Sequence, residues 1–170
     1  MKDPLQFTGE LLAIGVADKA KDPIQLRNMA EVVVGQGIVG DRYYEGCGAG
    51  QKGRTSIKPE QHVTLIAAEA IDDACNESGL PITHQLTRRN LLVRGVPLND
   101  LVNQTFRVGE VVLRGLEPCD PCGYMERQTF PHIKQALLKR GGLRTCVLSG
   151  GTIRVGDEVV PQQNTQRTDR

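Results

Sequence analysis

The chain has no tryptophan and only three phenylalanine and three tyrosine residues among its 170 amino acids. Proteins that bind single-stranded nucleic acid stack bases on aromatic side chains, so this scarcity argues against that function. An excess of charge of one sign is also absent, because 21 basic and 20 acidic residues leave a formal net charge of +1. Such a balance does not favour general binding to nucleic acid or to an anionic membrane. No nucleic-acid or membrane partner is therefore expected.

Long apolar runs are missing as well. No stretch approaches the roughly 20 apolar residues that a helix needs to cross a bilayer. Residues 1–5 lack the apolar centre of a signal peptide. The five cysteines are an odd number and thinly spread, which fits reduced thiols better than a disulfide framework. They are Cys47, Cys75, Cys119, Cys122 and Cys146. The sequence therefore predicts a cytoplasmic protein, long enough for one domain with its own core.

Glycine is abundant, at 19 of 170 residues, whereas its usual share is roughly 7%. This composition is typical of many tight turns between short strands. Branched and apolar runs bounded by turn residues predict strands at residues 11–16, 31–34, 62–66, 90–93, 105–108, 111–116, 145–148 and 158–160. Two similar turns, at residues 107–110 and 154–157, join extended segments through a glycine followed by an acid. Each of them predicts a hairpin.

Few helices are predicted. Apolar residues with helical spacing from Ala67 to Ala74 predict a helix that Gly79 ends. A second helix is predicted from Thr129, as its N-cap, to Gly141. Many strands and few helices, in no regular alternation, favour a mainly β (α+β) fold, either a barrel or a sandwich with helical insertions.

The predicted domain spans residues 11–160. Residues 1–10 and 161–170 are predicted to be flexible termini. The last ten residues in particular carry almost no apolar side chains. Residues 46–59 contain four glycines and three cations without any periodicity, which predicts a mobile loop.

Residues 117–123, Glu-Pro-Cys-Asp-Pro-Cys-Gly, are the most informative segment for chemistry. The two prolines stiffen the backbone around Cys119 and Cys122 and keep it out of the helical region. Thiolate is a nucleophile and a soft metal ligand, so a rigidly held cysteine is a candidate for either chemistry. By itself the Cys-x-x-Cys spacing leaves three interpretations open: a zinc site, a redox pair, or two buried small side chains. Zinc is not expected, since no second ligand pair is present.

Arginines form a second group of candidates. Residues 85–91 place two guanidinium groups and an amide at the head of an apolar run. A guanidinium group presents a rigid fork of donors that matches phosphate or carboxylate. The alternative is that these arginines pair with carboxylates such as Asp41 or Glu69, or simply face water. The candidates for one anion pocket are Arg88, Arg89 and Arg144.

Several segments, taken in order, resemble the MOSC domain. They are residues 35–42 (Gly-Gln-Gly-Ile-Val-Gly-Asp-Arg), 61–66 with Glu69, 88–91, 117–122, Arg144, and 156–157. The likeness extends over residues 11–160. MOSC domains occur at the C-terminus of molybdenum-cofactor sulfurases, in amidoxime-reducing enzymes, and as small stand-alone bacterial proteins, which this chain resembles in size.

The resemblance implies a β-barrel of the pyruvate-kinase-barrel-like type. It also implies a role in binding the molybdenum cofactor (molybdopterin) or in delivering sulfur to it. Cys122 matches the key cysteine of the family, as molybdenum ligand or persulfide carrier, and Cys119 ranks second. Arg88 and Asn90 match the Arg-x-Asn that meets the pterin phosphate. The other residues implied to bind the cofactor are Arg89, Arg144, Arg42 and Asp41.

The implied partners are the cofactor, its sulfur-delivery enzymes in a pyridoxal phosphate-related pathway, and an electron-transfer protein. The implied activity is sulfur transfer or reduction of N-hydroxylated compounds. One position departs from the family, because Tyr43 stands where many small members have histidine. Tyrosine does not titrate near neutral pH, so acid–base chemistry is not expected there. Two other classes stay open: a metal-free module that binds or detoxifies N-hydroxylated small molecules, and a structural interaction domain.

Overall fold

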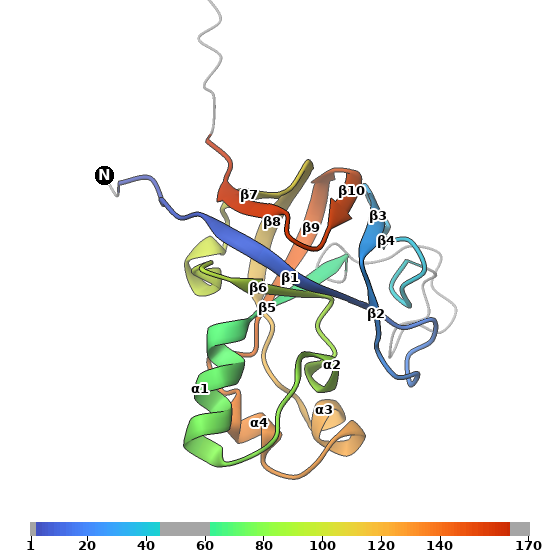
Figure 1. Ribbon diagram of the computed structural model, residues 1–170, viewed down its shortest axis with the longest axis vertical. Helices are drawn as coiled ribbons and strands as arrows, with labels where there is room; N and C mark the ends of the chain where they lie inside the picture. The colour runs from blue at the N-terminus through green and yellow to red at the C-terminus, as the bar shows by residue number, and fades with distance from the viewer. Residues whose placement is uncertain (1–2, 45–61, 164–170) are drawn as a thin grey trace, which may run out of the picture.

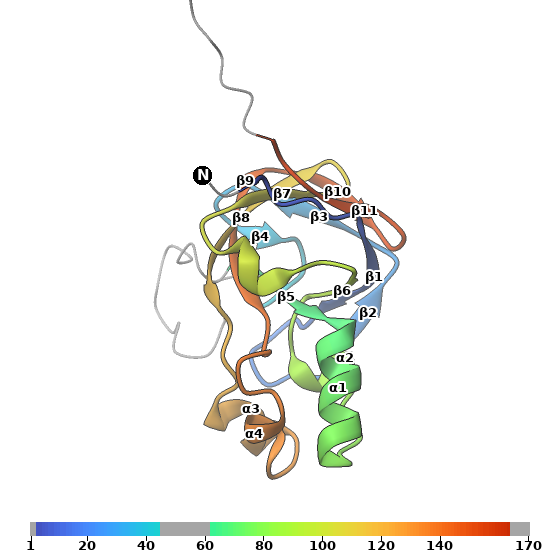
Figure 2. The same ribbon diagram turned by 90° about the vertical axis from the view of Figure 1, so that its left-hand side faces the viewer.

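A closed barrel forms the centre of the computed structural model, which describes residues 3–44 and 62–163. Its neighbouring strands follow the order β11, β7, β8, β9, β5, β6, β1, and β11 then pairs with β1 to close the ring (Figures 1 and 2). The bounds are β1 Gly9–Val16, β5 Val63–Ala67, β6 Leu91–Arg94, β7 Thr105–Val108, β8 Val111–Pro118, β9 Leu143–Ser149 and β11 Glu158–Pro161. The β5–β6 pair is parallel, whereas the other neighbours in the ring are antiparallel.

A smaller sheet lies beside the barrel. It has the order β10, β3, β4, with β3 Met29–Val33, β4 Gly37–Ile38 and β10 Gly151–Arg154. A further short strand, β2 (Gln25–Arg27), pairs with β1 outside the ring. The chain therefore passes from the barrel to the smaller sheet and back twice.

The barrel interior is filled by alternating branched and aromatic side chains, as half-buried strands require. Leu11, Ile14, Leu65, Phe106 and Leu143 are fully buried there. A second apolar cluster, which includes Ile66, Ile71, Met125, Ile133 and Leu137, lies under the helices. Closing the ring leaves no unpaired edge among these strands, which removes a route to aggregation.

The helices gather at one end of the barrel in both views (Figures 1 and 2). They are α1 Ala68–Ser78, α2 His84–Thr87, α3 Gly123–Gln128 and α4 Ile133–Ala136. A 3₁₀ turn, η2 (Leu98–Leu101), lies apart from them, beside the barrel strands (Figures 1 and 2). The helix α1 ends at Gly79, which adopts a left-handed φ of 73° and donates its N–H to the Cys75 carbonyl. Within the described residues no helix is both long and apolar enough to cross a bilayer.

The mainly β, barrel-type fold and the helix ending at Gly79 are confirmed. Each predicted strand overlaps an observed one, and the turn at residues 107–110 joins the antiparallel pair β7 and β8. Strand β1 begins at Gly9 and β11 ends at Pro161, slightly outside the predicted domain limits. The predicted mobile loop at 46–59, together with Cys47, lies outside the described residues.

Two local predictions were wrong. The turn at residues 154–157 is not a hairpin, because β10 pairs with β3 while β11 pairs with β7 and β1. Of the helix predicted from Thr129 to Gly141, the structure forms only the short α4, Ile133–Ala136, and the preceding helix α3 ends at Gln128. Thr129 ends α3 instead of beginning a helix, and His132 is left-handed with a φ of 75°. Pro131 explains the break, since proline disfavours a helical residue before it and donates no N–H.

Candidate functional site

A pocket of about 190 Å³ opens where β8 ends and where β6 and β9 begin, next to α3. Two thiols and four guanidinium groups line it, together with the rings of Tyr43 and Tyr124. The cysteines are Cys119 and Cys122, and the arginines are Arg42, Arg88, Arg89 and Arg144. These residues come from segments far apart in the chain, so only the closed barrel brings them together.

The cysteine turn, residues 119–122, follows β8 directly. Cys119 is buried, with 3% of its surface exposed, whereas Cys122 is exposed and forms the N-cap of α3. Both thiols are free. The Cys119 N–H donates to the Gly142 carbonyl at 2.8 Å, which ties the turn to the start of β9. The pocket therefore has an inner and an outer sulfur.

Arg144 lies on β9 opposite Glu117 of β8, and its Nε is 3.7 Å from a Glu117 carboxylate oxygen. Burial is the largest single influence on the Arg144 pKa and lowers it, but attraction to Cys119, Glu117 and Tyr43 raises that pKa overall. The side chains of Arg144 and Cys119 line the same pocket and lie near enough for this attraction to act. Arg144 thus places a permanent positive charge beside the inner sulfur.

Arg88 ends α2 in the left-handed region, with a φ of 60°. This conformation is strained for a residue with a side chain, and such residues concentrate at functional sites. Its guanidinium donates to the carbonyls of Ala20 and Asp22, both at 2.9 Å. Burial, followed by repulsion from Arg42, lowers the pKa of Arg88. Two cations close together in a partly buried pocket favour an anionic ligand, which would relieve their repulsion.

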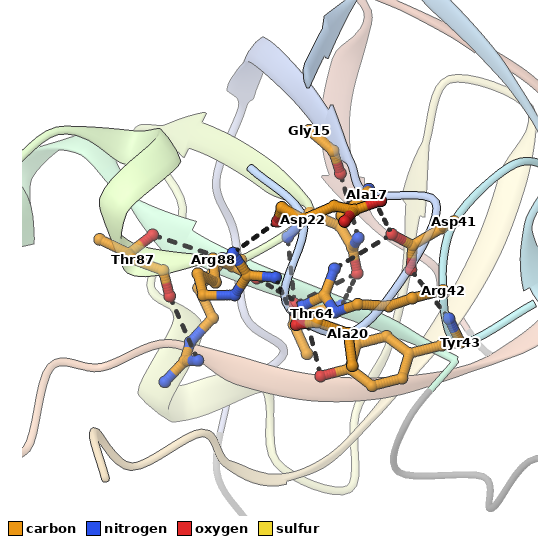
Figure 3. Close-up of polar contacts among 12 residues, drawn as sticks. Gly15, Ala17, Ala20, Asp22, Asp41, Arg42, Tyr43, Thr64, Thr87 and Arg88 are labelled. Atoms are coloured by element: carbon orange, nitrogen blue, oxygen red, sulfur yellow. Dashed lines mark hydrogen bonds and ion pairs between the residues drawn. The ribbon is translucent and has the colours of Figure 1, made fainter. Parts of the chain in front are cut away.

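Asp41 and Arg42 form a buried pair next to this pocket (Figure 3). Asp41 is fully buried and accepts hydrogen bonds from the Ala17 N–H and the Arg42 guanidinium, both at 3.1 Å. Arg42 donates to the Arg88 carbonyl at 3.1 Å and lies 4.3 Å from the centre of the Tyr43 ring. Asp41 itself is not among the lining residues, so its place in the structure is behind Arg42.

Asn90 is also fully buried and is not among the lining residues. Its side-chain oxygen accepts from the N–H and hydroxyl of Thr64, and its amide nitrogen donates to the Gly15 carbonyl at 3.1 Å. The amide thus joins three barrel strands. Of the predicted site residues, the structure brings the two cysteines and the four arginines together, but not Asn90 or Asp41.

A family model described as the MOSC domain matches residues 52–160. The chain belongs to the MOSC domain family. This family binds the molybdenum cofactor or acts in sulfur transfer. No curated protein matches the sequence significantly.

Solved structures share the fold of this MOSC domain. The YuaD protein from Bacillus subtilis is 19% identical, with 94% of this chain and 99% of that chain covered and a TM-score of 0.73. YiiM from Geobacillus stearothermophilus is 15% identical, with 91% and 75% covered and a TM-score of 0.68. YiiM from Escherichia coli is 14% identical, with 94% and 71% covered and a TM-score of 0.61. At these identities the likeness establishes the fold alone.

Sequence reasoning missed several lining residues of the MOSC pocket. Tyr124 follows the cysteine turn by two positions, a proximity that could have identified it, and its hydroxyl donates to the Ala20 carbonyl at 2.6 Å. Thr64 and Thr87 lie within or beside segments already singled out. Ala20 lies on the connection between β1 and β2, and nothing in the sequence marks it.

Proposed function

We propose that this MOSC domain binds the molybdenum cofactor, or handles sulfur for it, in the pocket that holds Cys119, Cys122 and the arginines. The observation that carries the proposal is the convergence of two free thiols with four guanidinium groups in one cavity. Neither group alone is informative, but thiolate and guanidinium together match a ligand that presents both a soft metal and a phosphate.

The residues fit the chemistry of the cofactor. Thiolates suit molybdenum bound to sulfur, and guanidinium forks suit its phosphate. The cavity, at about 190 Å³, is smaller than the roughly 300 Å³ at the lower end of pockets that enclose drug-sized ligands. We therefore propose that the cavity does not enclose the whole cofactor but takes its charged, phosphate-bearing end. When bound, the cofactor would supply the redox and sulfur chemistry.

The arginines differ in how much of each is left for a ligand. Among the described residues Arg144 has one ion-pair partner, Glu117 at 3.7 Å, and is attracted to Cys119, while about a third of its side chain (34%) is exposed. Arg88 and Arg42 spend some of their donors on protein carbonyls and on Asp41. Each guanidinium has five N–H donors, so both retain donors for a phosphate. We assign the anion to Arg144, Arg88 and Arg42.

We assign the metal-ligand or persulfide role to Cys122. It lines the cavity and is also exposed at its edge, so a sulfur-delivery enzyme or an electron-transfer protein could reach it. The inner sulfur of Cys119 is closed to a protein partner by its burial. Its contact with Arg144 places it where it can support the bound ligand.

The test is metal and phosphorus analysis of protein produced in a host that makes the cofactor. We expect molybdenum and phosphorus in wild type and in Cys75→Ser, whose cysteine lies on α1 away from the pocket. Cys122→Ser should lose the metal. Equal molybdenum in wild type and Cys122→Ser would eliminate the metal-ligand role, and a Cys122 that never carries a persulfide by mass spectrometry would eliminate the carrier role.

A second candidate function is metal-free binding of an N-hydroxylated or anionic small molecule. The small size of the cavity and its two tyrosine rings favour this alternative. Reduction of N-hydroxylated bases by purified protein with an electron donor separates the two. Activity that persists in Cys122→Ser would support the second function.

A further inference from the structure

We propose that Arg89 is a positioning residue and not an anion ligand: its guanidinium fixes the turn that carries Cys119 and Cys122. This inference rests on the proposed function only in taking the two thiols as the reactive groups. It changes the role that the resemblance implies for Arg89, and it leaves the anion to the other three arginines.

The donors of Arg89 are already occupied. Its Nε donates to the Gly141 carbonyl at 2.8 Å, and one terminal nitrogen donates to the carbonyls of Cys119 at 3.0 Å and Asp120 at 3.3 Å. The other terminal nitrogen donates to the Thr87 carbonyl at 3.4 Å. Because a guanidinium has five N–H groups, these four contacts leave one N–H for a ligand, too few for the paired contacts by which a guanidinium binds phosphate.

The cysteine turn depends on such an outside partner. It lies beyond the end of β8, so the carbonyls of Cys119 and Asp120 have no strand to accept from. Pro121 offers no N–H with which the turn could close on itself. Charge-assisted hydrogen bonds from Arg89 to two successive carbonyls therefore hold the Cys119–Asp120 and Asp120–Pro121 peptides.

The turn is also confined from its other side. A Cβ atom on Gly141 would lie 2.4 Å from the Cys119 carbonyl oxygen and 2.7 Å from Cδ of Pro121. Only glycine allows this approach, which brings the Gly141 carbonyl within reach of Arg89. The guanidinium thus joins the cysteine turn, which carries both sulfurs, to the turn before β9.

Arg89 is itself anchored at its backbone. Its carbonyl lies 2.8 Å from Nε2 of buried His84, and its N–H donates to the Thr87 hydroxyl at 3.4 Å. Nδ1 of His84 has no hydrogen-bond partner among residues 3–44 and 62–163, so we assign the ring proton to Nε2, which donates to the Arg89 carbonyl. Because both its backbone and its guanidinium are held, Arg89 can fix the position of the cysteine turn but cannot move to contact a ligand.

Two measurements on Arg89→Lys test the proposal. A lysine keeps the charge, but one ammonium cannot bridge the three carbonyls. We expect iodoacetamide to alkylate Cys119 about tenfold faster or more, because two or three charge-assisted hydrogen bonds are lost. Cys75 and Cys146 should react at wild-type rates, which a general loss of stability would not allow. In Arg89→Ala, millimolar guanidinium chloride should restore the protection of Cys119, and sodium chloride of equal concentration should not.

The second measurement is the dissociation constant for inorganic phosphate. This constant should stay within about twofold of wild type in Arg89→Lys, because lysine keeps the positive charge at position 89 and salt screens any small change in its position. In Arg144→Gln it should rise about tenfold, because charge-assisted hydrogen bonds are lost. Unchanged Cys119 reactivity in Arg89→Lys, or a loss of phosphate binding as large as in Arg144→Gln, would overturn the proposal. If wild type binds no phosphate, the proposed function fails while the alkylation result still decides the role of Arg89.

If the Arg89 variants do not fold, wild type alone gives the answer. Phenylglyoxal modifies accessible guanidinium groups, and phosphate should protect Arg144 from it while leaving the modification rate of Arg89 unchanged. Equal protection of Arg89 and Arg144 by phosphate would contradict a positioning role.

Discussion

At the scale of single residues, similar side chains in the pocket do different work because their partners differ. Arg144 faces Cys119 and Glu117, Arg88 holds the connection between β1 and β2, and Arg89 holds the cysteine turn. Residue type identified all of them as cations. Only the fold decides which guanidinium is left for a ligand, because three of the four carbonyls that occupy Arg89 lie 30 to 52 positions away in the chain.

A residue-scale prediction concerns His84 and pH. Burial is the main cause that lowers the pKa of His84, although the Arg89 carbonyl acts to raise it. The folded state therefore prefers neutral His84, while the unfolded chain takes up a proton near the ordinary value of 6.5. Stability that His84 contributes is fully present above pH 6.5 and decreases as the pH falls below it, with a slope of at most about 1.4 kcal/mol per pH unit.

Urea unfolding between pH 5 and 8 measures this effect. We expect the free energies of unfolding of wild type and His84→Gln to run parallel above pH 6.5 and to converge below it. Glutamine retains an N–H that can reach the Arg89 carbonyl. A difference between the two proteins that is constant across the whole range would show that His84 does not titrate as the burial implies.

At the scale of the elements, local signals were sufficient where pairing is local. Alternating side chains and the Gly109 turn identified β7 and β8, and the alanine spacing with Gly79 identified α1. The same kind of turn at Gly156 led to the wrong prediction of a hairpin, because β10 pairs with β3, more than 100 residues earlier. The apolar spacing after Thr129 led to the wrong prediction of one long helix, because Pro131 interrupts the helical backbone there. Pairing partners that are distant in sequence leave no local trace.

An element-scale prediction concerns Gly141, where the start of β9 approaches the cysteine turn. In Gly141→Ala the added methyl group would meet the Cys119 carbonyl and Pro121, so we expect a loss of about 1–3 kcal/mol of stability from overpacking. The matched control is Gly123→Ala at the start of α3, where the nearest atom is the flexible end of Arg127 at 3.2 Å. There alanine should be neutral or stabilise by up to about 1 kcal/mol.

Thermal and urea unfolding of both variants check this expectation. A Gly141→Ala protein as stable as Gly123→Ala would mean that the turn moves freely, and the account of a fixed cysteine turn would fail with it.

At the scale of the whole molecule, the barrel is the support on which the pocket depends. Strands β1 and β11, from the two ends of the described chain, pair to close the ring, and the helices cover one end (Figure 2). The cysteine turn, Arg89 and Arg144 all lie where barrel strands begin or end. The ring can therefore hold them in fixed relation although no local contact in sequence links them. The sequence resemblance predicted a barrel of this type, but it could not predict which strands close the ring.

A prediction at this scale separates stability from binding. Phe106 is fully buried in the barrel core and does not line the pocket. Phe106→Ala should reduce the free energy of unfolding by about 3–5 kcal/mol, while Arg107→Ala, its exposed neighbour on β7, should change it by no more than about 0.5 kcal/mol. The phosphate dissociation constant of the folded Phe106→Ala protein should equal that of wild type. If folded Phe106→Ala protein bound phosphate more weakly than wild type, packing in the barrel core would affect the geometry of the pocket, contrary to this prediction.

The most direct measurement for the central claim is a crystal structure of the protein with the molybdenum cofactor, with anomalous scattering recorded at the molybdenum edge. The account predicts a molybdenum peak at bonding distance from the Cys122 sulfur and the cofactor phosphate in contact with Arg144. A molybdenum peak away from both cysteines, or a phosphate held elsewhere than among Arg42, Arg88 and Arg144, would contradict it.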